Sequence, residues 1–292
     1  MTDRSRIPSL RVRPRNRSTS SDSIDRVTRV VKAMDAQPEE SRLGQELIHF
    51  SSLLGMHMCP RQYVLAGRSE HTIYNSVNGA MRIVWKIGRA VENHIREQYI
   101  AGVQGEGVVG KWSCLCGRKE ISGEKPSSST HCTRCGWVTD KYNELSLVDV
   151  DTGIIGNPDM ILQKNGLHQV VEIKSIKRPG PDGFEGLNDA IGPKADHAIQ
   201  GCGYRRLLQK NGYRVSPNII VLYGAKDYKF GNVYKEFQVN AAQYDSILDA
   251  LWDIAHTIKR HREQGTLPER ERCVSCDSTL AKGCPVVQAC FD

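Results

Sequence analysis

The sequence predicts an α/β fold, and three features carry that prediction. Residues 154–176 hold two apolar runs around Lys164-Asn165-Gly166, and an Asn-Gly pair between apolar runs is a strong hairpin signal. Residues 218–224 form a short continuous apolar run, as a buried strand would. Residues 78–99 and 240–264 repeat apolar side chains every three to four positions, which is typical of amphipathic helices. The 39% hydrophobic and 25% charged residues suit a globular fold with a core.

The chain begins with a basic arm. Residues 1–42 are rich in Arg, Ser, Asp and Pro, a composition typical of a disordered or loosely held segment. Contact with nucleic-acid phosphates and a merely solvated tail are equal alternatives for it. Residues 43–292 are then expected to form one domain. Its first element, residues 43–65, has a helical pattern that Cys59-Pro60 breaks into two pieces.

The later elements follow from local patterns. Residues 141–150 alternate like a strand, so that three antiparallel strands are expected together with the hairpin. Residues 182–192 indicate a loop and residues 196–208 a helix. Residues 234–239 predict a more exposed strand, and Asn240 is a suitable cap for the long helix that follows it.

Charge and hydropathy indicate the kind of partner and the cellular location of the protein. The chain of 292 residues has a formal net charge of +7, which favours a polyanionic partner. No apolar run approaches the roughly 20 residues of a membrane span, and the amino terminus lacks the apolar core of a secretory signal. We therefore expect no membrane partner and a reducing, cytoplasmic location.

Ten cysteines in a reducing compartment indicate metal binding, because disulfides are rare there. One group lies within residues 110–138, where C-x-C precedes C-x2-C and each pair is followed by Gly. Four thiolates suit tetrahedral Zn²⁺ and leave no open coordination position, so this zinc-knuckle insertion should be structural. Its expected ligands are Cys114, Cys116, Cys132 and Cys135. Nearby aromatic and basic residues could touch DNA: Lys111, Trp112, Arg134 and Trp137.

A second kind of site is predicted on the hairpin. Glu172 and Lys174 lie two positions apart and project from one face of a strand, with Asp159 opening the adjacent strand. Carboxylates of Glu92, Asp159 and Glu172, with the Ile173 carbonyl, would suit Mg²⁺ or Mn²⁺. Glu92 taken alone is more simply a surface carboxylate.

Phosphodiester hydrolysis needs a metal that neutralises the phosphate and activates a water. Lys174 would orient or deprotonate that water, or stabilise developing charge; these roles remain open. Gln200 and Tyr204 share a helix face and would bind phosphate or position the ligands, with a buried polar pair as the alternative.

The motifs in this order resemble those of the PD-(D/E)xK nuclease superfamily. They are Gly156-Asn157-Pro158-Asp159, Glu172-Ile173-Lys174 and Gln200-Gly201-Cys202-Gly203-Tyr204, the last matching the QxxxY motif of the RecB-like branch. The resemblance covers about residues 45–290 and implies a central mixed sheet flanked by helices. That branch usually has G-x-x-x-H on the first helix. Here Glu92 follows Gly88 at that place, as in some other nucleases of the superfamily, and His94 is a weaker substitute.

The terminal cysteines extend the resemblance to one group of nucleases within this branch. Cys59 before the core and the cluster at residues 273–290 look like the iron–sulfur staple of CRISPR-associated and recombination exonucleases, in which four thiolates hold a 4Fe–4S cluster. This chain offers five candidates, one of them spare: Cys59, Cys273, Cys276, Cys284 and Cys290. A second zinc is the main rival. Cys202 is expected to be a small core residue.

The resemblance implies a metal-dependent DNA exonuclease acting on single strands or free ends in recombination, repair, replication or end processing. Recombination or replication proteins would be its partners, and a phage gene, with a bacterial host cytoplasm, is one source. The alternatives are a structure-specific endonuclease, and a zinc and iron–sulfur protein that binds nucleic acid without catalysis.

Overall fold

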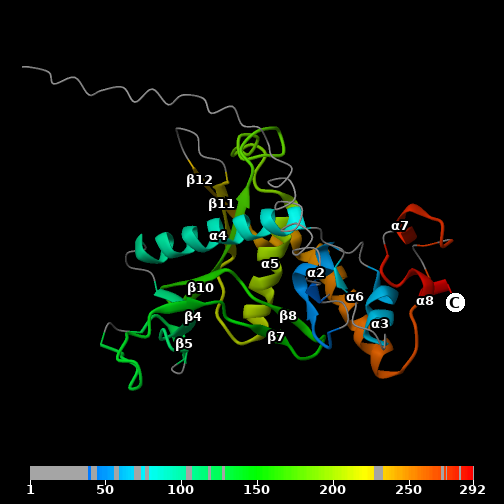
Figure 1. Cartoon of the computed structure of the whole chain (residues 1–292), viewed down its shortest axis with the longest axis horizontal. Coiled ribbons are helices and arrows are strands. Elements are labelled where there is room, and N and C mark those ends of the chain that lie inside the picture. The colour runs from blue at the N-terminus through cyan, green and yellow to red at the C-terminus, as the bar shows by residue number, and fades with distance from the viewer. Residues whose placement is uncertain are drawn as a thin grey trace, which may run out of the picture.

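The computed structural model describes residues 39–40, 45–55, 59–68, 74–75, 79–102, 107–117, 120–126, 129–226, 233–270, 273, 275–282 and 284–291. Most of the predicted basic arm, residues 1–38 and 41–42, lies outside this part of the chain. The described residues form a mixed α/β structure in which a large mixed sheet is flanked by helices (Figure 1).

Twelve strands are described, in three sheets. The main sheet has seven strands in the order β12-β11-β10-β9-β4-β5, with β6 also paired to β4. Only the β10–β11 pair in it is parallel. Its strands are β4 (Gly107–Ser113), β5 (Glu120–Glu124), β6 (Lys141–Asn143), β9 (Met160–Lys164), β10 (Leu167–Ile176), β11 (Asn218–Ala225) and β12 (Tyr234–Asn240). The smaller sheets contain β2 (Ile48–His49), β8 (Ile154–Gly156) and β7 (Leu147–Asp149), and β1 (Glu39–Glu40) with β3 (Tyr74–Asn75).

Helices cover both faces of the main sheet. The described helices are α2 (Phe50–Gly55), α3 (Pro60–Arg68), α4 (Gly79–Gly102), α5 (Ala195–Lys210), the 3₁₀ turn η2 (Ala241–Tyr244), α6 (Asp245–Glu263), α7 (Thr279–Lys282) and α8 (Val287–Phe291). Alternation along the strands separates two apolar clusters. Val171 and Ile173 pack with Ile95 of α4, whereas Val170 packs with Leu207 of α5. Glu172 and Lys174 therefore point toward α5.

Several predicted elements are confirmed. The helix at 78–99 is α4, the helix at 196–208 is α5, and the strands at 218–224 and 234–239 are β11 and β12. Asn240 is a cap as predicted, since its side chain accepts from the Ala242 amide, although it caps η2 and α6 begins only at Asp245. The predicted loop at 182–192 contains neither helix nor strand.

Residues 141–150 were predicted as one strand beside the hairpin, and that prediction is wrong in part. They form β6, which pairs with β4, and β7, which pairs with β8 in a different sheet. The reason is packing: Tyr142 lies against the Trp112 ring at 5.2 Å, while Asp149 accepts a hydrogen bond from Trp252 of α6. The chain must therefore change sheets at residues 144–146.

Two further boundaries differ from prediction. The first hairpin strand begins at Met160, because Pro158 has no N–H for a sheet ladder. Residues 48–49 pair with β8 as a strand, so the first helix begins only at Phe50.

The first turns of α4 carry an exposed apolar surface. Met81, Val84, Trp85 and Ile87 are 40–49% exposed. The helix approaches the sheet closely at Gly88 and packs on it through later residues such as Ile95.

Candidate metal centre and cysteine sites

The β9–β10 hairpin sets the geometry of the predicted metal centre. Asn165 and Gly166 both have positive φ, 51° and 73°, as a two-residue type I′ turn requires. Because Lys164 then pairs with Leu167, Met160 falls opposite Val171, and Asp159 arrives beside the Glu172–Lys174 segment. The predicted turn is confirmed, and it fixes this register.

Hydrogen bonds fix the three hairpin residues in place. Asp159 Oδ2 accepts a hydrogen bond from the Ile173 amide at 2.7 Å, and Lys174 Nζ lies 2.5 Å from Glu172 Oε1. The Glu172 side chain is 1% exposed. Its other oxygen, Oε2, is buried and has no hydrogen-bond partner among the described residues. An unpaired carboxylate oxygen in the interior is costly, so this atom fits a site for a divalent cation.

Glu92 reaches the same place from α4. Its Oε1 accepts hydrogen bonds from the Ser175 amide at 3.1 Å and the Ser175 hydroxyl at 2.8 Å. Gly88 makes this approach possible, because a Cβ there would lie 3.1 Å from Ser175 Oγ and 3.3 Å from Lys226 Nζ. Glu92 is therefore joined to the strand that carries Glu172 and Lys174, and the reading as an isolated surface carboxylate is wrong.

Burial dominates the electrostatics of the centre. It raises the pKa of Glu172 to about 8, only partly offset by Lys174, and it raises the pKa of Asp159. Burial alone would lower the pKa of Lys174, but the neighbouring Glu172 and Asp159 charges raise it above its usual value. The centre thus combines carboxyl groups of raised pKa with one firmly protonated lysine.

Gln200 and Tyr204 lie on the face of α5 that packs against this centre. Gln200 Nε2 donates to the Tyr204 hydroxyl at 2.9 Å, and the Tyr204 side chain is buried. Tyr204 also packs against the first motif, since a Cβ on Gly156 would lie 2.7 Å from its ring. The hydrogen-bonded pair matches the buried polar alternative, and a role in binding phosphate stays a prediction.

Two residues at the centre were not singled out from the sequence. Arg96 Nη2 lies 3.0 Å from Glu144 Oε1 and 3.8 Å from Asp159 Oδ1. Burial and then the Asp159 charge raise the pKa of Glu144. Arg96 stands one helical turn after Glu92, a signal that could have found it. Nothing local marks Glu144, because it joins the site only when the chain crosses between sheets.

A neutral histidine lies close by. His197 Nδ1 is 2.8 Å from the Tyr223 hydroxyl, which also accepts from the Lys194 amide at 3.0 Å. Since that hydroxyl accepts from the amide, its own proton is available to His197. Burial lowers the pKa of His197 to about 4, against the opposing effect of Asp196. His197 is therefore an uncharged group beside the centre at neutral pH.

The predicted zinc-knuckle cysteines come together. The sulfur atoms of Cys114, Cys116, Cys132 and Cys135 all lie within 4.8 Å of one another, so this group can hold a metal ion. Zn–S bonds of about 2.3 Å place tetrahedral sulfurs about 3.8 Å apart, which this spacing accommodates. The thiolate chemistry also suits iron–sulfur binding. Amide donors at Cys135 and Arg134 lower the pKa of the Cys132 thiol, which favours ligation.

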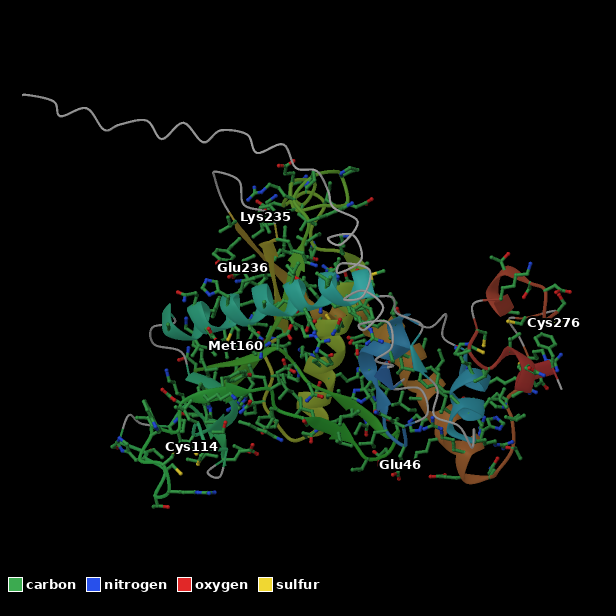
Figure 2. The ribbon with its side chains drawn as sticks, viewed as in Figure 1. Glu46, Cys114, Met160, Lys235, Glu236 and Cys276 are labelled. Carbon is green, nitrogen blue, oxygen red and sulfur yellow. The ribbon has the colours of Figure 1, made fainter. Side chains whose placement is uncertain are left out.

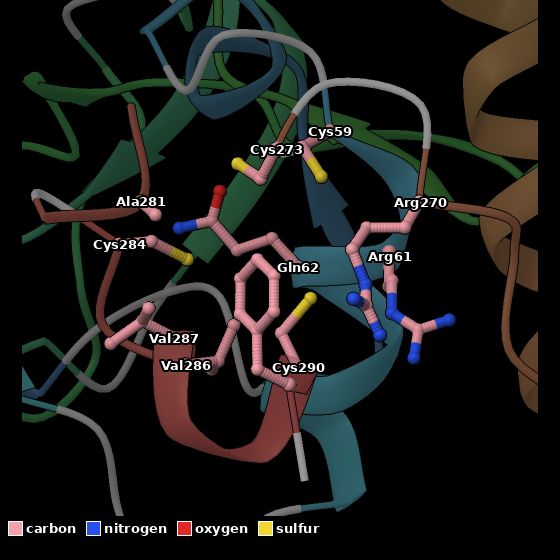
Figure 3. A pocket seen from close by; sticks show the side chains of 11 residues that line it. Cys59, Arg61, Gln62, Arg270, Cys273, Ala281, Cys284, Val286, Val287 and Cys290 are labelled. Carbon is pink, nitrogen blue, oxygen red and sulfur yellow. The ribbon is translucent and has the colours of Figure 1, made fainter. Parts of the chain in front are cut away.

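The terminal cysteines also meet, at the other end of the molecule from Cys114 (Figure 2). Cys59, Cys273, Cys284 and Cys290 line one cavity, where their side chains surround Gln62 (Figure 3). Cys276 is exposed and is not among the lining residues. The spacing differs from that of the zinc-knuckle group: among the described residues, no three of these sulfurs lie within 4.8 Å of one another.

A scan against protein-family models and a search of curated proteins each find no match for this chain. Within the described residues, no helix combines the length and the apolar character needed to cross a membrane.

Proposed function

We propose that this protein is a metal-dependent deoxyribonuclease of the PD-(D/E)xK superfamily, acting as an exonuclease. One observation carries the proposal. Glu172 Oε2 is fully buried without a partner in the described structure, next to Asp159 and Lys174. A buried, unpaired carboxylate oxygen is a favourable ligand for a divalent cation, and a lysine beside it can stabilise the charge that develops on a reacting phosphate.

The fold supports the same proposal. Asp159 precedes β9, Glu172 and Lys174 lie on the antiparallel β10, and β11 runs parallel to β10. α4 supplies Glu92 from one face of the sheet and α5 supplies Gln200 from the other. This is the order of motifs and the mixed sheet expected of the RecB-like branch.

Mg²⁺ or Mn²⁺ at Asp159, Glu172 and the Ile173 carbonyl would neutralise phosphate charge and lower the pKa of a bound water. Ser175 orients Glu92 through two hydrogen bonds so that this carboxylate can join them. The raised pKa of Lys174 favours the charged ammonium, and hence stabilisation of a developing negative charge over proton abstraction. The Gln200–Tyr204 hydrogen bond fixes these two side chains relative to each other on the face of α5 that packs against the site.

We further propose a 4Fe–4S cluster at Cys59, Cys273, Cys284 and Cys290, with Cys276 spare. These four cysteines line one cavity, as the four thiolate ligands of one cluster would, whereas Cys276 is not among the residues that line it. α3 carries residues 60–68 and α8 residues 287–291, and the two helices are in contact. The cluster would therefore tie the two ends of the domain together.

A DNA-digestion experiment tests the proposal. End-labelled single- and double-stranded DNA is incubated with Mg²⁺ or Mn²⁺ and either the wild type, Asp159→Ala or Lys174→Ala. Release of nucleotides by wild type alone is expected. Wild type that cuts nothing would leave only a binding protein, and variants that cut as well as wild type would refute a nuclease centre at Asp159 and Lys174. A parallel digestion of circular DNA separates the exonuclease, which needs an end, from the endonuclease.

A further inference from the structure

A polar cavity of about 710 Å³ lies beside the proposed metal centre. One wall is the second half of α4, including Asn93 and Arg96, and the opposite wall includes Lys125 and the residues of β6 with their flanks. The cavity is lined by three cations and three acids, Arg96, Lys125 and Lys141 against Glu97, Asp140 and Glu144. The asparagines at positions 93, 143 and 157 and Tyr142 add uncharged polar groups.

The cavity adjoins the metal centre directly. Arg96 lines it and also lies 3.8 Å from Asp159 Oδ1, and Asn157 lines it two residues before Asp159. The same helix carries Glu92 one turn before Arg96. Suppose that the reacting phosphodiester of a nucleic-acid strand lies at Asp159 and Glu172. The strand can then continue into the cavity along α4.

We propose that this cavity binds the unpaired strand of the nucleic acid on one side of the scissile phosphodiester. This inference rests on the proposed function and deepens it, because it assigns the single strand that the resemblance implies as substrate to one cavity of this chain, between α4 and β6. Two buried polar atoms support it, since neither the Arg96 Nε nor the Tyr142 hydroxyl has a hydrogen-bond partner within the described residues. Arg96 also stacks above the Tyr142 ring, at 5.8 Å from its centroid, as cation and aromatic groups do on single-strand platforms.

Size excludes a duplex from the cavity. A volume of 710 Å³ corresponds to a cube of side about 9 Å, whereas the major groove of B-DNA alone is about 12 Å wide. Amides and carboxylates suit hydrogen bonds to the exposed edges of unpaired bases, and the cations suit a small number of phosphates.

The zinc-knuckle insertion contributes Lys125 to the far wall and is joined to the rest of that wall through β4 and β6. Lys141 and Tyr142 pair with Ser113 and Trp112 of β4, and Cys114 follows that strand immediately. The Trp112 and Tyr142 rings pack edge to face at 5.2 Å. A metal held by the four cysteines would therefore fix the wall that faces α4, which gives this insertion a function in substrate binding.

The test measures binding, without hydrolysis. A fluorescent oligothymidylate of about twelve nucleotides is titrated with the full-length protein at several salt concentrations and without added Mg²⁺. The variant is Lys125→Ala with Lys141→Ala, at two exposed positions of the cavity. The control, Lys164→Ala with Lys282→Ala, removes the same charge at exposed positions elsewhere.

If each cavity lysine contacts one phosphate, the cavity variant lowers the slope of log K against log salt by about 1.4, and the control leaves it unchanged. Asn93→Trp, which fills the cavity with a larger side chain, should weaken binding at least tenfold. Unchanged slopes and affinities in both variants would overturn the inference even if wild type cleaves DNA. Failure of the nuclease proposal is distinguishable, because it appears as absence of cleavage whatever the binding result.

Discussion

Magnesium binding at the hairpin should be strongly coupled to protons. Glu172 is the most buried carboxylate of the centre, and its pKa of about 8 means that a proton competes with the metal at neutral pH. Lys174 stays protonated across this range because its pKa is raised, so it does not enter the proton balance. Affinity for Mg²⁺ should therefore rise with pH.

The size of the effect follows from the pKa. With a pKa of about 8, about 1% of the Glu172 carboxyl is ionised at pH 6 and about half at pH 8. Apparent affinity should then fall about 50-fold from pH 8 to pH 6, or about 2.3 kcal/mol. If Mg²⁺ at 100 times its Kd stabilises the protein by about 2.7 kcal/mol at pH 8, the same concentration gives only about 0.6 kcal/mol at pH 6.

The metal-free protein should show the opposite trend. A carboxyl whose folded pKa is raised from 4.5 to about 8 contributes stability that is complete below pH 4.5 and is lost as pH rises to about 8. Mg²⁺ reverses this loss by binding the ionised form. Thermal unfolding with and without Mg²⁺, at pH 6 and pH 8, measures both trends on one preparation.

Calorimetric titration of Mg²⁺ at pH 7, in two buffers of different ionisation enthalpy, measures the number of protons that are released per metal ion bound. About 0.9 proton should leave Glu172 per Mg²⁺ bound, and Asp159, whose pKa is also raised, can only add to that. Glu172→Gln, the matched control, should bind Mg²⁺ weakly and without this release. Mg²⁺ binding that releases no protons and is equally tight at pH 6 and pH 8 would refute the reasoning.

Three other predictions concern separate parts of the molecule. Lys174→Ala should lower the cleavage rate of DNA about 10²–10³-fold even at saturating Mg²⁺, because it removes the charge that would stabilise negative charge developing on the reacting phosphate. Cys284→Ser should remove absorbance near ~400 nm and bound iron after anaerobic purification, whereas Cys276→Ser should retain both. Asp149→Ala should lower the free energy of unfolding, measured by urea denaturation, by about 3–5 kcal/mol. The reason is that the buried carboxylate accepts hydrogen bonds from Trp252 at 2.7 Å and Lys210 at 3.2 Å.

Local chemistry explains what could be predicted from the sequence. The Asn165-Gly166 turn has one favoured backbone geometry, which fixes strand register and therefore which side chains share a face. The meeting of Asp159 with the Glu172–Lys174 segment follows directly. The zinc-knuckle group is similar, since its two cysteine pairs are short motifs whose turns need only local hydrogen bonds, such as the Gly136 amide to the Cys132 carbonyl.

Tertiary packing explains what could not be predicted. Residues 141–150 have a strand pattern throughout, yet Tyr142 and Asp149 pack in different parts of the fold, so the strand breaks between them. Glu144 reaches the centre only through that break. Which terminal cysteines line the shared cavity depends on how the C-terminal segment packs against α3, and no spacing rule distinguishes Cys276 from Cys284.

The cost of burying Glu172 is itself an argument for a ligand. An apolar side chain at that position of β10 would pack against α5 without desolvating a charge, and replacing buried ionic groups by apolar ones is often stabilising by about 1–4 kcal/mol. The Lys174 contact satisfies only one carboxylate oxygen, and the other has no partner within the described structure. Asp159 and Glu92 add like charge nearby, which raises the cost further. Structure alone does not explain such a cluster, whereas a divalent cation offsets all of these costs at once. Burying these carboxyl groups without a metal destabilises the folded protein. Binding of a divalent cation removes that unfavourable free energy, and this makes cation binding favourable.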